Sequence, residues 1–298
     1  MKKNKKNQKL ANLGQPFYGD LLARSLLRIG VPKFEAYEIA HSIWKKVAHQ
    51  KDGLLRIPKL VVGILRERNP ELVKRYQDWR KILKSSKPLI LLIGGGTGIG
   101  TSTLAVRLAW LLEMNRVIST DSVREIVRHL LPNEITPTLK VSTFEAGKEV
   151  TQVKSKHDRL IYGFVSQSRK VLYGIEALVD RSIRERESMI IEGVHLIPSE
   201  MGFLSRYSKQ ATIVFVMLDV EQQSKHRQHF FLRNLQNSKR SKMRYLKFFK
   251  EIRLIRDYLV GEARKKKIPL VENYDLRQAE HEILDLIFRA RNHRKRSS

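Results

Sequence analysis

The chain has 298 residues, no cysteine and a formal net charge of +28. This length accommodates one large core, or one core and a small domain. The lack of cysteine excludes disulfides, thiolate zinc sites and a cysteine nucleophile. No apolar run reaches the length of a bilayer span, and no apolar stretch follows the N-terminal lysines. We therefore expect a cytoplasmic protein without a membrane segment.

Positive charge is concentrated at both ends. Residues 1–9 hold five lysines and residues 291–298 hold four arginines and lysines, and neither segment contains an acid. We expect a basic disordered tail at residues 1–9 and a basic tail at residues 291–298. The rest of the chain still carries +19, which attracts polyanions such as nucleic acid, phosphorylated metabolites or a membrane surface. Charge alone does not choose among these partners, and greater solubility would explain it equally well.

Residues 10–84 show the apolar spacing of a small helical domain. One stripe runs from Leu21 to Ile29, a second from Ala36 to Val47 and a third from Ile57 to Leu65. Asn69-Pro70-Glu71 reads as a cap, a first-turn proline and a first-turn acid that open a fourth helix. A polar hinge at 84–88 then marks a domain boundary.

From Pro88 to about residue 290, strand and helix patterns alternate. This order predicts an α/β domain with a five-stranded, mostly parallel sheet flanked by helices. The expected strands are 89–93, 116–119, 188–192, 212–218 and 268–272. Apolar spacing also predicts one long helix from about Ile161 to Ile183 and another from about Met243 to Ala263.

A glycine-rich segment follows the first predicted strand. Residues 94–103 read Gly-Gly-Gly-Thr-Gly-Ile-Gly-Thr-Ser-Thr. The phosphate-binding pattern G-x-x-x-x-G-K-[ST] fits in one frame, from Gly95 to Ser102, with Thr101 in the lysine position. Strand–loop–helix is the context that this motif requires. The residues predicted to contact ATP are Gly95, Gly96, Thr97, Gly98, Ile99, Gly100, Thr101, Ser102 and Thr103.

The missing lysine removes a positive charge from the phosphates, so other cations must converge on the site. The segment after the fourth strand supplies Lys225, His226, Arg227, His229 and Arg233. Small phosphotransferases commonly close a basic lid over ATP. We therefore predict catalytic roles for Arg227 and Arg233, with a solvated basic helix as the alternative.

Acidic residues stand at the ends of the second and third strands. Asp121 can orient or deprotonate an acceptor hydroxyl, or it can be a plain helix N-cap. Arg124 and Arg128 on the following helix suit an anionic acceptor. Glu192 stands where a Walker-B acid would sit, and with Ser102 it is expected to hold Mg²⁺.

Residues 239–250 hold six basic residues, three aromatics and no acid. Such interleaving suits single-stranded RNA. However, Phe249 lies on the apolar stripe of its helix, which favours a basic outer face on a helix with a buried side.

Taken together, these motifs closely resemble the 2-phosphoglycerate kinase family. The resemblance is carried by Gly100–Thr103, Ile118–Glu125, Ile190–Pro198 and Ile268–Asn273, and covers roughly residues 88–290. Because several spaced motifs are involved, it is more specific than the loop alone. The family uses ATP to phosphorylate the free hydroxyl of 2-phosphoglycerate, giving 2,3-bisphosphoglycerate.

The resemblance also implies roles for individual residues. Asp121 would face the acceptor hydroxyl, Arg124 and Arg128 would bind the acceptor's phosphate or carboxylate, and His195 would belong to the substrate site. A threonine in the lysine position is tolerated in the family. The sequence is thus interpreted as a magnesium- and ATP-dependent kinase, that is, a nucleotide-binding transferase, with a small phosphorylated acid as substrate.

Residues 14–83 are similar to a degenerate ATP-cone, a small helical nucleotide-binding module found before some members of the family. The module's opening β-hairpin is not recognisable in residues 1–14, so a structural role is expected for this domain.

Two alternative functions remain at the level of sequence. One is a kinase of the same fold that acts on RNA or aminoacyl-tRNA, since a nucleic-acid partner is compatible with the charge although not favoured. The other is a non-catalytic ATP- or RNA-binding protein in which Thr101 marks lost chemistry. The sequence does not indicate an oligomeric state.

Overall fold

The computed structural model describes residues 15–48, 50, 53–83, 85–132, 136–232 and 239–293. The chain divides into two compact units, Met1–Ser85 and Ser86–Ser298. This division falls inside the hinge expected at 84–88. No helix in the described ranges has the length and apolar character needed to cross a bilayer.

The described part of the first unit is helical. Its helices are α2 (Gln15–Arg28), α3 (Lys33–Val47), α4 (Gly53–Arg68) and α5 (Pro70–Leu83). Asn69 caps α5, since its Oδ1 accepts a hydrogen bond of 2.9 Å from the backbone N–H of Glu71. The predicted start of this helix is therefore confirmed. The apolar stripe predicted between Ala36 and Val47 is buried in α3.

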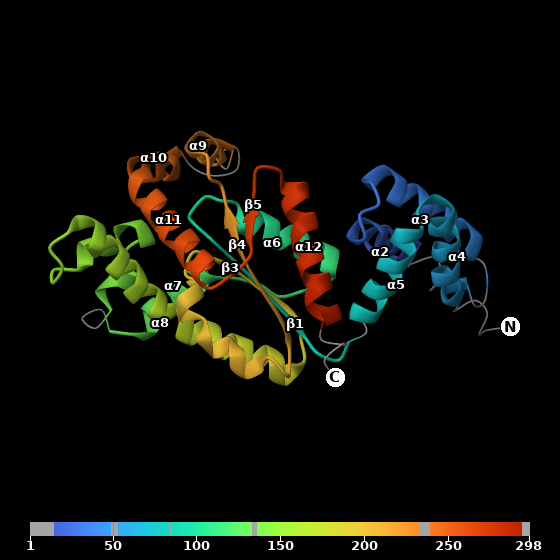
Figure 1. The fold of residues 1–298 in the computed structure, drawn as a ribbon, viewed down its shortest axis with the longest axis horizontal. Coiled ribbons are helices and arrows are strands. Elements are labelled where there is room, and N and C mark those ends of the chain that lie inside the picture. Colours follow the sequence, from blue (N-terminus) through green and yellow to red (C-terminus); the bar gives the residue numbers. More distant parts are fainter. Residues whose placement is uncertain are drawn as a thin grey trace, which may run out of the picture. The chain divides into compact units, whose positions relative to one another are not determined.

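The second unit is built on a five-stranded sheet of order β2-β3-β1-β4-β5 (Figure 1). Its strands are β1 (Leu89–Gly95), β2 (Val117–Ser119), β3 (Met189–Gly193), β4 (Thr212–Asp219) and β5 (Leu270–Glu272). Every neighbouring pair is parallel, so the sheet is fully rather than mostly parallel. All five predicted strands are confirmed, because short apolar runs between polar or glycine-containing segments make strong signals.

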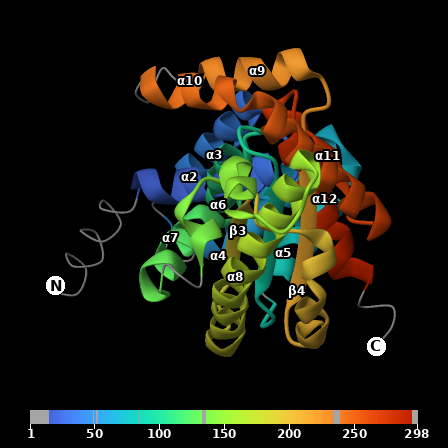
Figure 2. The same cartoon turned by 90° about the vertical axis from the view of Figure 1, so that its left-hand side faces the viewer.

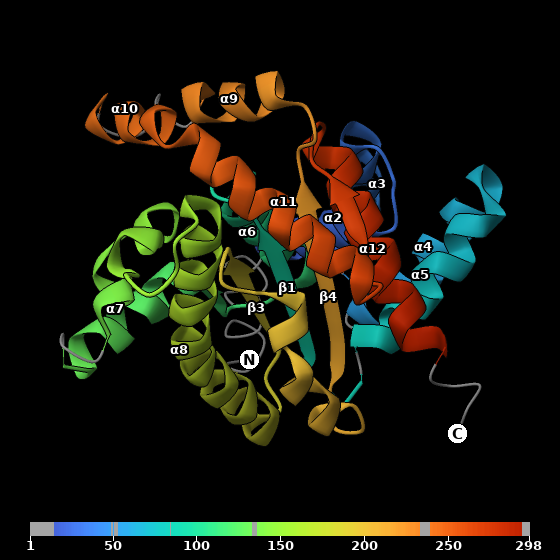
Figure 3. The same ribbon diagram turned by 60° about the vertical axis from the view of Figure 1, so that its left-hand side comes forward.

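The described part of this unit also contains α-helices. They are α6 (Thr101–Leu112), α7 (Thr120–Leu130), α8 (Lys156–Glu185), α9 (Gln223–Leu232), α10 (Lys239–Lys247), α11 (Phe249–Lys265) and α12 (Leu276–His293). The short 3₁₀ helices are η1 (Pro137–Lys140), η2 (Thr143–Glu149), η3 (Pro198–Glu200) and η4 (Gly202–Tyr207). Helix α6 packs with α12 on one side of the sheet, and α8 packs with α11 on the other (Figures 1 and 3).

The helix predicted from Met243 to Ala263 is wrong as a single element, because it consists of α10 and α11, which meet at Phe248 (φ −100°, ψ 21°). No glycine or proline marks this break. Its cause is tertiary, since the ring of Phe248 packs on that of Phe144 in η2 with centroids 5.3 Å apart. Figure 2 shows α9 and α10 lying together at one end of this unit.

At the other end of the unit, α12 continues to His293, so residues 291–293 of the predicted C-terminal tail are helical. The remainder of that tail and the predicted tail 1–9 lie outside the described residues.

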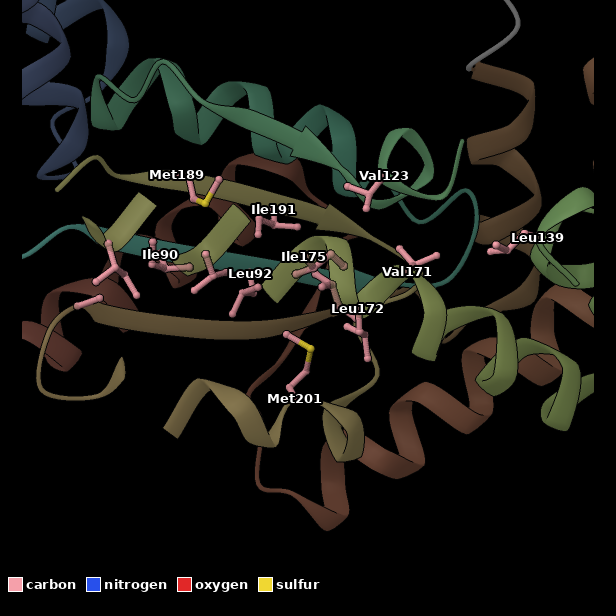
Figure 4. Packing of buried hydrophobic residues seen from close by; sticks show 14 residues of the cluster. Ile90, Leu92, Val123, Leu139, Val171, Leu172, Ile175, Met189, Ile191 and Met201 are labelled. Carbon is pink, nitrogen blue, oxygen red and sulfur yellow. The ribbon is translucent and has the colours of Figure 1, made fainter. Parts of the chain in front are cut away.

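One large apolar cluster joins the sheet to α8 (Figure 4). Ile90, Leu92 and Ile191 contribute from β1 and β3, and Val171 and Ile175 contribute from α8. All five side chains are fully buried. This packing fixes the carboxyl ends of β1, β2 and β3 relative to one another, and those ends carry the candidate site.

Candidate active site

The glycine-rich segment forms the turn between the central strand β1 and the N-terminus of α6. Gly98 and Gly100 have φ values of +85° and +99°, a backbone region that residues with a side chain rarely adopt. Gly100 is the N-cap of α6. A turn of this kind presents backbone N–H groups and the positive end of a helix to the same point, which is an anion-binding arrangement.

The two hydroxyl residues that open α6 share one carboxylate. Thr101 Oγ1 donates to Glu192 Oε2 at 2.6 Å, and Ser102 Oγ donates to Glu192 Oε1 at 2.9 Å. Glu192 is buried at the end of β3, where it lies level with Ile93 of β1. Thr101, in the position of the usual lysine, therefore has a structural contact of its own, because its hydroxyl binds the Glu192 carboxylate of the neighbouring strand.

Oxygen ligands at this point suit a hard cation. A helix-opening serine and a carboxylate at a strand end are the donors that Mg²⁺ takes in phosphate-loop proteins. The residues described contain no cluster of three or more His, Asp or Glu side chains that could hold a metal by themselves. The set formed by Ser102 and Glu192 therefore fits an ion that is also coordinated by nucleotide phosphates and water.

Asp121 lies in the first turn of α7, directly after β2. Ser119 of β2 is level with Glu192, which brings the two strand ends together. The N-cap of α7 is Ser119, whose Oγ accepts a hydrogen bond of 3.0 Å from the N–H of Ser122. The alternative in which Asp121 serves as a plain N-cap is therefore excluded. Its side chain is 71% exposed.

The two arginines of α7 occupy different surroundings. Arg124 Nη1 donates to the backbone carbonyls of Leu139 (3.2 Å) and Val141 (2.8 Å). Its Nε lies 3.7 Å from Asp121 Oδ1. Arg128 forms an ion pair with Glu125. Arg124 thus ties the segment after η1 to the helix that carries Asp121, a contact that the sequence did not indicate.

His195 is fully buried two residues beyond β3. Its Nε2 lies 3.2 Å from Gln167 Oε1 and its Nδ1 lies 3.0 Å from Thr120 Oγ1. Because an amide oxygen only accepts, Nε2 carries the proton and Nδ1 accepts from Thr120. Burial lowers the pKa of His195 to about 4, so the ring is neutral. Its described contacts are with the protein, and sequence reasoning missed both of its partners.

The residues predicted to form a basic lid differ in their burial and in the groups that they contact. His226 is buried and its Nε2 lies 2.9 Å from the carbonyl oxygen of Thr97 in the loop. Arg227 is exposed, with its guanidinium 4.5 Å from the centroid of the Phe249 ring. Lys225 Nζ lies 4.1 Å from the centroid of the Tyr274 ring. Arg233 lies outside the described residues.

Two residues beside the loop were missed by sequence reasoning. Asn273 follows β5, and its Nδ2 donates to the carbonyl of Ile99 at 2.7 Å. Arg256 of α11 packs against Gly96, and its Nε donates to Asp219 Oδ1 at 2.5 Å. The available signals were the position of Asn273 directly after β5 and that of Asp219, the partner of Arg256, at the end of β4, since parallel strands meet at one edge.

The aromatic residues between 239 and 250 pack against other aromatic side chains of the protein. Tyr245 packs between Phe230 and Phe144, with centroid distances of 5.2 and 5.9 Å. Phe249 is buried. Rings held in this way do not form a stacking platform for bases. Because Arg244, Lys247 and Lys250 are exposed, the structure supports a basic outer face on the described part of this stretch.

Together these features define the class of the second unit: a phosphate-loop kinase domain. The class is set by a glycine turn between a central parallel strand and a helix, with acids at the ends of the two strands beside it.

Comparisons with known proteins give the particular family. The 2-phosphoglycerate kinase of Methanocaldococcus jannaschii is 36% identical over 278 residues, which cover 91% of this chain and 87% of that protein. The 2-phosphoglycerate kinase of Methanopyrus kandleri is 38% identical, with coverages of 91% and 84%. The chain belongs to the 2-phosphoglycerate kinase family.

Other comparisons add little to this assignment. No family model matches the chain. Among solved structures, a gluconokinase from Sinorhizobium meliloti aligns with a TM-score of 0.42 and 16% identity, over 71% of this chain and 98% of that one. The family assignment therefore depends on the sequence relatives.

The loop geometry predicts that Thr101→Lys retains the fold and ATP binding. The backbone donors of the loop are unchanged, and a lysine at this position can reach the phosphates or pair with Glu192. Calorimetric titration with Mg-ATP measures the affinity. As a contrast, Gly98→Ala should abolish binding, because a Cβ there would lie 2.3 Å from the Phe230 ring at a φ of +85°. Loss of ATP binding in Thr101→Lys would contradict the geometry described.

The buried neutral histidine predicts a pH dependence of stability. The folded-state pKa of His195, about 4, lies below its ordinary value of 6.5, so between these values the unfolded chain binds the extra proton. The free energy of unfolding should therefore fall as pH drops from about 6.5 towards 4, by up to ~1.4 kcal/mol per pH unit for this group. Urea titrations of the wild type and His195→Gln check this, and equal slopes would contradict it.

Proposed function

We propose that the chain is an ATP-dependent kinase that transfers the γ-phosphoryl group to the hydroxyl of 2-phosphoglycerate. The products would be 2,3-bisphosphoglycerate and ADP. One observation carries the proposal: the phosphate loop and the strand-end acids Glu192 and Asp121 meet at one edge of the sheet in a chain of this family. A site that only bound nucleotide would not need an acceptor acid.

The loop would bind the phosphates of ATP through its backbone N–H groups. The N-terminus of α6 adds the positive end of a helix dipole at the same place. One charge-assisted contact contributes roughly 1.5–3 kcal/mol, so the absence of lysine weakens the site without eliminating it. Arg227 and Arg233 remain our candidates for contacts to the transferring phosphoryl group.

Mg²⁺ bound with the nucleotide would neutralise charge on the phosphate oxygens. The residues that would hold it are Ser102, through its hydroxyl, and Glu192, directly or through water. In the structure the Glu192 carboxylate already accepts two hydrogen bonds from the start of α6. Glu192 would therefore also keep the serine hydroxyl oriented.

Asp121 would accept the proton of the acceptor hydroxyl, or orient that hydroxyl, as the phosphoryl group is transferred. Its exposure and its position directly after β2 support this role. We assign the anionic groups of the acceptor to Arg128 and Arg124. Because Arg124 also binds the carbonyls of Leu139 and Val141, it would shape the acceptor side as well as contribute charge. His195 would support the acceptor site indirectly, through its contacts with Thr120 and Gln167.

The proposal predicts 2,3-bisphosphoglycerate when the purified protein is incubated with Mg-ATP and 2-phosphoglycerate. Phosphorus NMR resolves this product from the substrates, and ADP should form in a 1:1 ratio with it. Omission of 2-phosphoglycerate is the control. Turnover of a different acceptor, without product from 2-phosphoglycerate, would overturn the assignment.

The Asp121→Asn variant tests the acceptor acid in the same assay. A positioned general base contributes roughly 10²–10⁴-fold to rate, so kcat should fall by about that amount, while the affinity for ATP stays unchanged because Asp121 lies outside the loop. Ile126→Ala, at an exposed position of the same helix, is the matched control and should retain most of the activity.

A further inference from the structure

We propose that His226 and Asn273 are positioning residues that hold the phosphate loop by its outward-facing carbonyl groups. They keep the N–H groups of the loop directed at the phosphates in a site that has no lysine. The identity of the ligand as a nucleotide rests on the proposed function, whereas the contacts themselves are properties of the protein.

The two contacts lie on consecutive parts of the loop. His226 Nε2 lies 2.9 Å from the carbonyl oxygen of Thr97, and Asn273 Nδ2 lies 2.7 Å from that of Ile99. In a trans peptide the carbonyl and the following N–H point in opposite directions. Fixing the carbonyl of Thr97 therefore fixes the N–H of Gly98, and fixing that of Ile99 fixes the N–H of Gly100.

The orientation of His226 is itself determined by a second contact. A carbonyl oxygen only accepts, so Nε2 carries the proton and Nδ1 is left as an acceptor. Arg253 Nη1 lies 3.4 Å from Nδ1, and the same guanidinium donates to the carbonyls of Val220 (2.7 Å) and Glu221 (2.8 Å). The end of β4 is thereby connected through Arg253 and His226 to the loop.

Apolar packing shields the His226 side of this contact from water. Phe230, one turn further along α9, stacks on the His226 ring with centroids 5.3 Å apart. The Phe230 ring also covers Gly98 so closely that an added Cβ would lie 2.3 Å from it. His226 is fully buried, and burial lowers its pKa to about 4, so it acts as a neutral donor. A hydrogen bond in such surroundings resists competition from solvent.

This arrangement gives α9 a second role besides that of presenting Arg227 to the phosphates. The helix contacts the outer side of the loop through His226 and Phe230, and Asn273 supports the loop from the segment after β5. With no lysine amine in the site, binding depends more strongly on the direction of the backbone N–H groups. Small errors in that direction weaken hydrogen bonds steeply.

The test compares His226→Leu with His226→Gln. Leucine removes the donor, whereas the amide of glutamine can still donate to the carbonyl of Thr97. Calorimetric titration with Mg-ADP, without acceptor, measures affinity. We expect about tenfold weaker binding in His226→Leu and recovery to within about threefold of the wild type in His226→Gln. Gln228→Leu, at an exposed position of the same helix, is the matched control and should bind ADP like the wild type.

The Asn273→Asp variant tests the second contact to the loop independently. The side chain keeps its shape, but an acceptor replaces the donor that faces the carbonyl of Ile99. ADP binding should weaken at least tenfold, while thermal denaturation confirms that the variant is folded. The KM for the acceptor should be unchanged in every folded variant, which a general loss of structure would not produce.

The outcomes separate this role from the proposed function. ADP affinities of His226→Leu and Asn273→Asp equal to that of the wild type would overturn the positioning role alone. Equal weakening in His226→Leu and His226→Gln would overturn the role of the donated hydrogen bond. A wild-type protein that binds no Mg-ADP would overturn the proposed function together with this inference.

Discussion

The organisation of the site depends on the carboxylate of Glu192, which accepts hydrogen bonds from both hydroxyls at the start of α6. Thr101 and Ser102 are adjacent in the chain, while Glu192 comes from a strand about ninety residues further on. This contact sets where the loop ends and where the acid of β3 stands. A lysine at position 101 would extend past the loop, whereas the threonine turns back to the neighbouring strand. The residue at this position therefore contacts Glu192, the acid of the proposed metal site, and not the phosphates.

The loop is then held from two sides. Inside, its helix is fixed to β3 through Glu192. Outside, the carbonyls of Thr97 and Ile99 accept hydrogen bonds from His226 and Asn273. A similar arrangement supports the proposed acceptor side, where buried His195 connects Thr120 of α7 to Gln167 of α8. Gly193 allows this close approach, because a Cβ there would lie 2.1 Å from Thr120 Oγ1. Two neutral buried histidines thus support the site: His226 contacts the phosphate loop, and His195 contacts the start of α7.

Much of the fold could be predicted from the sequence because its signals are local. The strands are short apolar runs, the loop is marked by glycines, and Glu192 stands at the end of such a run, so its place beside β1 follows from parallel pairing. The break at Phe248 and the partner of Thr101 could not be predicted, because each depends on a residue distant in sequence. His226 was interpreted as a cation for the same reason. Its neutrality comes from Phe230 and from burial, which composition and spacing do not reveal.

The central claim is that Thr101 acts through Glu192, and a double-mutant cycle tests it most directly. The affinity for Mg-ADP is measured in the wild type, Thr101→Val, Glu192→Ala and the double variant, with folding checked by thermal denaturation. If the hydroxyl acts through the carboxylate, Thr101→Val weakens binding in the wild type but has little further effect once Glu192 is gone. We predict a coupling of about 1 kcal/mol, or roughly fivefold. Equal effects of Thr101→Val in both backgrounds would contradict the account.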